Sequence, residues 1–187
     1  MIDESIIAGC HSGDRRCQNS LVQTFAPRLM ALCLRYCKDE EEAKDALQET
    51  FIAAFKYMYS YKNEGNFEAW IRKIAVRQCL ALIRKRDKFD FVEEKNLEWF
   101  GDAVIPDVYS KIGIDEILSL LNQLPKSLYL VFNMAVIEGL SHQEVGEILN
   151  ISESTSRAHL VRARLKMQEL IHNHYRNHWK CKEVKTA

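Results

Sequence analysis

The stretch SHQEVGEILNISESTSRAHLVRAR, which begins at Ser141, constrains the fold most, because it predicts two helices separated by a very tight turn. Ser141 and Glu144 have the spacing of a capping box, so a helix should begin at His142. Asn150 should end that helix, because Asn is among the few non-Gly residues that tolerate left-handed backbone. Ser152 can then cap the second helix.

Gly146 lies inside the first of these helices, where Gly costs roughly 0.5–1 kcal/mol of stability relative to Ala. A Gly at this position is reasonable if there is no room for a side chain, so we predict that another helix crosses closely there. The start of the second helix should expose polar side chains, namely Ser154, Thr155, Arg157, His159 and Arg162. A helix N-terminus with such groups suits phosphates and base edges, and the spacing is that of a helix-turn-helix. A helical hairpin with a solvated basic face fits the same stretch.

Apolar residues recur at helical spacing along most of the chain, so the sequence predicts an all-α fold. Helices are expected in residues 3–37, with a break around Gly13, and in residues 39–60, with an apolar stripe that includes Ala43, Leu47 and Phe51. Another is expected in residues 67–86, with Trp70, Ile74 and Leu82 pointing inward. From about Gly113, one more helix should stop near Pro125 and another should end at a left-handed Gly139. Only 7 Gly and 3 Pro in 187 residues argue against a turn-rich all-β fold.

Charges are segregated along the chain, although the formal net charge is zero. Residues 70–88 contain seven basic residues against one acid, whereas residues 89–107 contain six acids against one Lys. Residues 39–49 also contain six acids against one Lys. Helical periodicity is lost over 89–112, which predicts an acidic linker. We therefore predict two small helical domains at 1–88 and 113–175, the second a helix-turn-helix domain, and a tail at 176–187.

Several classes of protein are not expected from this sequence. There is no run of about 18 apolar residues and no signal-peptide pattern at the start, so we expect a cytoplasmic chain without a membrane span. The six Cys form no Cys-x-x-Cys pair and are expected to be free thiols. The C-terminal candidates for metal ligands match no standard zinc spacing: His172, His174, His178 and Cys181. No catalytic motif occurs, so we expect no metal, no cofactor and no enzymatic activity.

Three segments in a fixed order carry a resemblance to a known family. EEAKDALQETFIAAFKYM (41–58) resembles the segment of bacterial RNA polymerase sigma factors that grips the polymerase clamp. FEAWIRKIAVRQCLALIRKR (67–86) resembles the segment that melts the promoter −10 element, and residues 121–167 resemble the −35-binding domain. The order and short length are similar to the compact extracytoplasmic-function (ECF) group, which has two helical domains and a linker.

The resemblance implies a role for each matching residue. Asp45, Gln48 and Glu49 would meet the basic clamp helices of core polymerase. The loop at 62–66 would hold a flipped base through Lys62, Asn63 and Asn66, next to Phe67 and Trp70, although aromatic residues at this spacing are more often part of the core. The helix after the loop would follow the DNA backbone through Arg72, Lys73, Arg77, Arg84 and Lys85. The −35 duplex would be read by Ser154, Thr155, Ser156, Arg157, His159 and Arg162.

Three residues depart from the family pattern and leave the base specificity open. Arg77 and Ala81 stand where many members have Asn and Asp, and Ser156 stands where a buried Val is common. The implied partners are core RNA polymerase, promoter DNA and an anti-sigma protein. Two alternatives remain, namely a helix-turn-helix regulator that acts without entering polymerase and a helical adaptor that binds only proteins.

Overall fold

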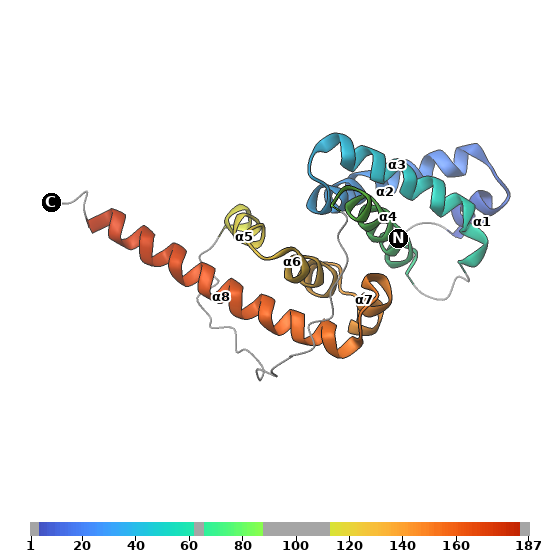
Figure 1. Cartoon of the computed structure of the whole chain (residues 1–187). Coiled ribbons are helices and arrows are strands. Elements are labelled where there is room, and N and C mark those ends of the chain that lie inside the picture. Colours follow the sequence, from blue (N-terminus) through green and yellow to red (C-terminus); the bar gives the residue numbers. More distant parts are fainter. Residues whose placement is uncertain (1–3, 62–65, 88–112, 184–187) are drawn as a thin grey trace. The chain divides into compact units, whose positions relative to one another are not determined.

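The computed structural model describes residues 4–61, 66–87 and 113–183, and every regular element among them is a helix (Figure 1). The chain divides into two compact units, Met1–Asp90 and Phe91–Ala187. The all-α class predicted from the sequence is therefore confirmed. No helix of the described part has the length and apolar character needed to cross a bilayer. The predicted linker, residues 89–112, lies outside the described residues.

The N-terminal unit is a bundle in which α2, α3 and α4 pack against one another and α1 lies on α2 (Figure 1). Its elements are α1 (Glu4–His11), α2 (Arg15–Tyr36), α3 (Glu40–Lys56), the 3₁₀ turn η1 (Met58–Ser60) and α4 (Phe67–Asp87). The predicted break at Gly13 is confirmed, because this residue has a φ of +80° between α1 and α2. Asp14 caps α2 by accepting a hydrogen bond from the Arg16 backbone N–H at 2.7 Å.

The buried face of α4 differs from the prediction. Trp70, Ile74 and Leu82 were expected to point inward, but all three are only half-buried. The residues of α4 that fill the core are Phe67, Ile71, Ala75, Val76, Cys79, Leu80 and Ile83. Because α2 and α3 both cover α4, its buried face is wider than one apolar stripe and is centred elsewhere.

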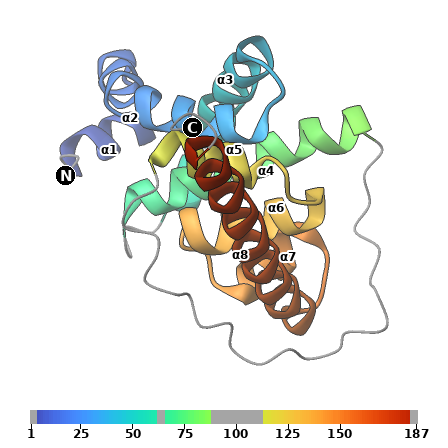
Figure 2. The same cartoon turned by 90° about the vertical axis from the view of Figure 1, so that its left-hand side faces the viewer.

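The C-terminal unit is built on one long helix, α8, which α6 and α7 cross and α5 also contacts (Figure 2). Its elements are α5 (Ile114–Leu121), α6 (Lys126–Phe132), the π-helical turn η3 (Asn133–Ile137), α7 (His142–Leu149) and α8 (Glu153–Glu183). One core cluster joins α5 to α8 through Leu120, Leu121, Leu124, Ala163, Met167 and Ile171. The first part of the predicted tail, from residue 176, is a continuation of α8 to Glu183.

The turn between α7 and α8 follows the sequence rules closely. Ser141 and Glu144 form the predicted capping box, with the Ser141 backbone N–H donating to Glu144 Oε2 at 2.8 Å. Asn150 has the expected left-handed backbone, with a φ of 59°. A methyl group added at Gly146 would lie 2.7 Å from the Ile151 carbonyl oxygen. The close approach at Gly146 is therefore made by the backbone of the turn, and not by a crossing helix as predicted.

The capping box gives a stability prediction. Ser141→Ala removes the hydroxyl that accepts the Glu144 backbone N–H, and should lower the free energy of unfolding by about 1 kcal/mol. Urea unfolding of the full chain measures this. Ser141→Thr keeps the hydroxyl and Gln143→Ala changes an exposed side chain on the same helix, so both should stay near the parent value. Equal losses in all three variants would contradict the capping role.

Candidate nucleic-acid interface

The start of α8 is fixed by a cluster of hydroxyl groups. Ser152 caps the helix by accepting the Thr155 backbone N–H at 3.0 Å. The Ser152 hydroxyl also lies 2.8 Å from that of Ser154 and 2.7 Å from that of Thr155. These contacts satisfy donors of the first turn and hold the exposed end of α8 in one orientation.

The residues predicted to read the −35 duplex divide into an exposed and a buried set. Ser154 and Arg157 are exposed and Arg162 is half-buried. Thr155, Ser156 and His159 are only 1%, 0% and 3% exposed. The prediction that Thr155 and His159 face solvent is wrong, because α8 turns these positions toward the helices that it packs against. The His159 ring Nδ1 instead lies 2.9 Å from the Thr155 carbonyl oxygen of its own helix.

Ser156 has a structural partner on the first helix of the pair. Its hydroxyl lies 2.9 Å from the Nδ1 atom of His142 and so joins α7 to α8. Partial burial lowers the pKa of His142, and the nearby Arg157 and Arg164 guanidinium groups lower it further. A neutral imidazole can accept the Ser156 hydroxyl hydrogen. A hydroxyl at this buried position is thus accommodated by a hydrogen bond.

Glu153, which the sequence analysis did not single out, forms an ion pair with Arg157 one helical turn away. Both side chains are exposed, and an exposed pair of this kind contributes only about 0.3–0.5 kcal/mol, so a phosphate or base could replace Glu153. An open hollow beside the turn carries Gln143, Glu147 and Glu153 on its wall. The two carboxylates make this hollow unfavourable for a phosphate, and one of them, Glu153, is the partner of Arg157.

Two residues predicted to hold a flipped base have structural roles at the start of α4. Asn66 caps the helix, since its Oδ1 accepts the Glu68 backbone N–H at 2.9 Å. Phe67 is only 4% exposed and packs among the rings of Phe25, Tyr61 and Trp70, with centroid distances of 5.5, 5.1 and 5.3 Å. The prediction that Phe67 offers a surface to a base is therefore wrong for this conformation.

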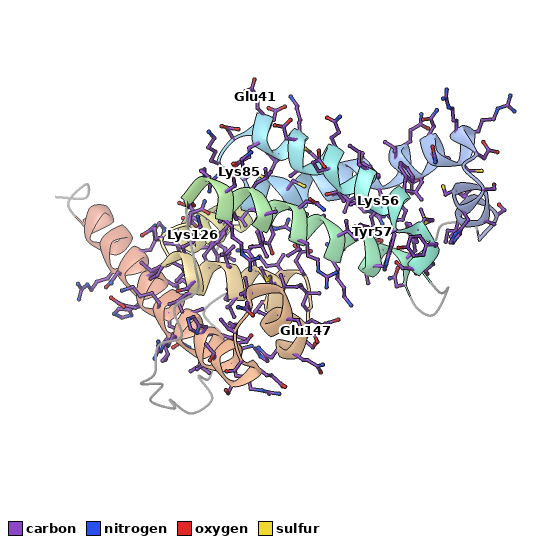
Figure 3. All side chains as sticks on the ribbon, turned by 45° about the vertical axis from the view of Figure 1, so that its right-hand side comes forward. Glu41, Lys56, Tyr57, Lys85, Lys126 and Glu147 are labelled. Carbon is purple, nitrogen blue, oxygen red and sulfur yellow. The ribbon has the colours of Figure 1, made fainter. Side chains whose placement is uncertain are left out.

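Trp70 is half-buried in this aromatic cluster, with its ring centroid 5.5 Å from that of Tyr61. Lys62 and Asn63, the remaining residues predicted for base capture, lie outside the described residues. Tyr57 and Tyr59, just before this loop, were missed and are 45% and 74% exposed. The signal that could have found them is the run KYMYSY, in which aromatic residues alternate with others. Figure 3 shows Tyr57 beside Lys56 at the end of α3.

The basic residues of α4 form a second candidate DNA surface. Arg77, Arg84 and Lys85 are exposed, and Arg72 and Lys73 are half-buried. Lys85 lies near the C-terminal end of the helix (Figure 3). Arg86 also carries charge there, but it pairs with Glu42 and Asp87. The helix therefore presents a series of cations that suits a phosphate backbone.

The third surface lies on α3. Asp45, Gln48 and Glu49 are exposed, as the resemblance implied. Ile52 is 50% exposed and continues the same helix face one turn further on, which the sequence analysis missed. An apolar side chain among charged and polar ones is the usual composition of a protein-binding surface.

No group of three His, Cys, Asp or Glu side chains that could hold a metal ion occurs in the described part of the chain. The side chains of His178 and Cys181, two of the four C-terminal candidates, lie outside that part. His174 Nε2 lies 2.9 Å from Glu116 Oε1, which links α8 to α5. This imidazole therefore contributes to packing within the unit.

Comparison with known proteins assigns each unit separately. The family model for Sigma-70 region 2 matches residues 21–89, and that for Sigma-70, region 4, matches residues 114–167. The chain is 27% identical over 173 residues to the RNA polymerase sigma-H factor of Pseudomonas aeruginosa, covering 87% of this chain and 90% of that protein. It is 25% identical over 188 residues to the ECF RNA polymerase sigma-E factor of Haemophilus influenzae, covering 92% and 95%.

Solved structures show the same fold at lower identity. CnrH in complex with the cytosolic domain of CnrY is 21% identical, with a TM-score of 0.57 over 91% of this chain and 97% of that one. The sigma factor RpoE of Bartonella quintana, in complex with the anti-sigma factor NepR, is 22% identical, with a TM-score of 0.56 over 82% and 95%. The chain belongs to the sigma-70 family, as an RNA polymerase sigma factor of the ECF group. Such factors are regulatory, non-catalytic subunits of transcription initiation.

Proposed function

We propose that this chain binds core RNA polymerase through α3, opens the −10 element at α4 and reads the −35 duplex with the start of α8. The main support for the proposal is the position of the two family matches along the chain. Region 2 covers the unit with the acidic α3 face and the basic α4, and region 4 covers the unit with the capped helix-turn-helix. Residues 1–88 and 113–175 would be the working domains, and residues 89–112 would be the acidic linker between them.

The polymerase contact rests on the exposed face of α3. The resemblance implies that Asp45, Gln48 and Glu49 meet basic clamp helices, and opposite charges steer such an encounter. Ile52 would supply apolar contact area at the same surface, since half of its side chain is exposed. The other half of α3 is buried in the bundle, so this face is the part of the helix that a partner can reach.

The DNA contacts rest on the two other surfaces. At −10, Trp70 would border the flipped base, Lys62, Asn63 and Asn66 would offer polar groups from the loop, and Arg72, Lys73, Arg77, Arg84 and Lys85 would follow the backbone. At −35, Ser154, Arg157 and Arg162 would contact the duplex directly. Thr155, Ser156 and His159, which are buried, would act by holding α8 in place.

An anti-sigma protein is the fourth proposed partner. The two structural neighbours described above are sigma factors bound to CnrY and to NepR. By analogy, a protein of this kind would cover the exposed charged helices of this chain until a signal releases it. The chain would then work in the cytoplasm with core polymerase, which carries out the chemistry without a cofactor from this subunit.

Transcription on a library of linear duplexes with randomised −35 and −10 elements tests this proposal. Bacterial core polymerase together with the full chain should give transcripts whose templates share a −35 and a −10 sequence. Sequence-specific duplex binding without a complex with core polymerase would overturn the proposal and support a regulator that acts alone. Absence of DNA binding in the presence and absence of polymerase would instead support the adaptor.

Charge reversal on α3 separates polymerase binding from duplex binding. Glu49→Lys should weaken the complex with core polymerase by at least about tenfold, because it places a cation against basic clamp helices. Binding to the −35 duplex should stay unchanged. Glu147→Lys makes the same charge change on an exposed residue of α7 and is the matched control, expected to leave polymerase binding intact. Equal losses in the two variants would show a net-charge effect and contradict the assigned surface.

A further inference from the structure

Three cysteines meet where the end of α2 packs on the middle of α4. Cys33 and Cys37 are one helical turn apart on α2, and Cys79 lies on α4. Cys33 and Cys79 are fully buried, whereas Cys37 is half-buried. The Cys79 thiol is hydrogen-bonded to those of Cys33 and Cys37. All three thiols are free in this structure, so the group is reduced.

Cys37 differs from the other two in its backbone and accessibility. It is the C-cap of α2, with extended backbone at φ −85° and ψ 157°, and its N–H donates to the Cys33 carbonyl oxygen at 2.9 Å. Cys37 is thus the first residue beyond α2, and its N–H completes the last hydrogen bond of that helix. Cys37 is also the member of the group that a small molecule in solvent can reach.

The hydrogen bond from Cys79, and not the surrounding charges, favours a thiolate at Cys37. The hydrogen bond from the Cys79 thiol lowers the pKa of Cys37, and Arg86 lowers it further, although partial burial, Glu42 and Asp39 act in the opposite direction. The pKa of Cys79 is raised by its hydrogen bonds to Cys33 and Cys37 and by burial. Because Cys37 is the accessible thiol and Cys79 is buried beside it, we assign Cys37 as the nucleophile of the group and Cys79 as the thiol that resolves it.

We propose that Cys37 and Cys79 form a reversible disulfide when the protein meets hydrogen peroxide. The Cys37 thiolate attacks one peroxide oxygen and breaks the O–O bond, which yields a Cys37 sulfenic acid and, after protonation, one water. The Cys79 sulfur then attacks the Cys37 sulfur, the S–O bond breaks, and a second water leaves. The two thiols lose two electrons and two protons, and the peroxide is reduced to two waters.

The same chain contains an internal comparison for this reaction. Cys10 on α1 and Cys17 on α2 also lie near each other, but burial raises the pKa of Cys10 to about 11. Desolvation and the Asp14 carboxylate raise the pKa of Cys17 as well. Neither thiol of this pair has a hydrogen bond that lowers its pKa, so the pair should react more slowly than Cys37. Metal binding by Cys33, Cys37 and Cys79 is not favoured, since the described residues contain no group of three such side chains able to hold an ion.

The proposed disulfide would tie the end of α2 to the helix that carries the exposed basic residues. Cys79 lies on α4 between Arg77 and Arg84, and the side chains of both arginines are exposed. The inference itself does not depend on the proposed function, because its readout is the chemical state of the sulfurs. A consequence for promoter opening would be a separate measurement.

Peptide mapping of the full chain tests the proposal. Trypsin should place Cys33, Cys37 and Cys79 in three different peptides, residues 29–35, 36–38 and 78–84, because Lys and Arg flank each one. After treatment with hydrogen peroxide and alkylation of the remaining thiols, the peptide 36–38 should be joined to 78–84. The intact mass should fall by two hydrogens, and dithiothreitol should reverse both changes.

Variants assign the roles of the sulfurs. Cys37→Ser should abolish the link, Cys33→Ser should retain it, and Cys79→Ser should leave a Cys37 sulfenic acid that a dione probe traps. Circular dichroism checks that each variant is folded. If a variant is not folded, the peptide map of the wild-type chain still tests the disulfide. A link between Cys10 and Cys17 in place of this one, or a Cys37 that reacts no faster than in urea-unfolded protein, would overturn the proposal.

Discussion

Replacing Arg157 and Arg162 by Ala should produce the largest loss of function at the −35 surface. Each arginine that reaches a base edge should contribute roughly 1–3 kcal/mol, so each substitution should weaken specific binding by roughly 5- to 150-fold. Arg157 is exposed beside the capped start of α8, and its present partner, Glu153, is a weak exposed one. Fluorescence anisotropy with the selected duplex and a scrambled duplex measures the effect.

The salt dependence of binding distinguishes base contacts from backbone contacts. A lost phosphate contact should weaken both duplexes equally and reduce the salt slope by about one, whereas a lost base contact should weaken only the selected duplex. Lys166→Ala is the matched control, because Lys166 lies further along α8 and pairs with Glu169. Binding that is unchanged in the double variant would contradict the assignment of this helix to DNA.

Gly146→Val should have the largest effect on stability. A methyl group at this position would already lie 2.7 Å from the Ile151 carbonyl oxygen and 3.6 Å from the Glu153 backbone nitrogen. Backbone atoms cannot move aside without opening the turn, so we expect a loss of about 1–3 kcal/mol even after a gain in helix propensity. In a unit of this size, each kcal/mol of lost unfolding free energy should lower Tm by roughly 4–8 °C.

Calorimetry of the full chain, together with duplex binding, measures the Gly146→Val effect. The transition of the C-terminal unit should shift and −35 affinity should fall, while polymerase binding through α3 should persist. Gly113→Ala is the control, since nothing lies within 4 Å of the added methyl group there and its φ is −66°. A Gly146→Val chain that unfolds at the parent temperature would show that the turn tolerates a side chain.

The features that the sequence predicted best are those set by residues close together in the chain. The capping box at Ser141, the left-handed Asn150 and the helix break at Gly13 each depend on a few neighbouring residues. Propensities and local hydrogen bonds decide such features, so a single sequence is sufficient. The exposed face of α3 was also predictable, because an acidic row opposite an apolar stripe needs no knowledge of the partner helix.

The features that the sequence did not predict depend on packing between distant elements. The burial of Thr155 and His159 follows from how α6 and α7 lie on α8, and the hydrogen bond between Ser156 and His142 follows from the same packing. Ile52 was missed because periodicity rules place apolar residues inward. Phe67 has an aromatic ring suited to base stacking, but three neighbouring rings occupy its surroundings.

The π-helical turn Asn133–Ile137 has a consequence for the register of the C-terminal unit. Its hydrogen bond from the Glu138 backbone N–H to the Asn133 carbonyl oxygen, at 2.9 Å, spans five residues where an α-helix spans four. The turn thus holds one residue more than an α-helical path would need. Deleting that residue would let α6 continue as an α-helix and rotate everything after it by about 100°. Ser141 and the start of α8 would then be aimed differently, so chain length between α6 and α7 sets the direction in which α8 is presented.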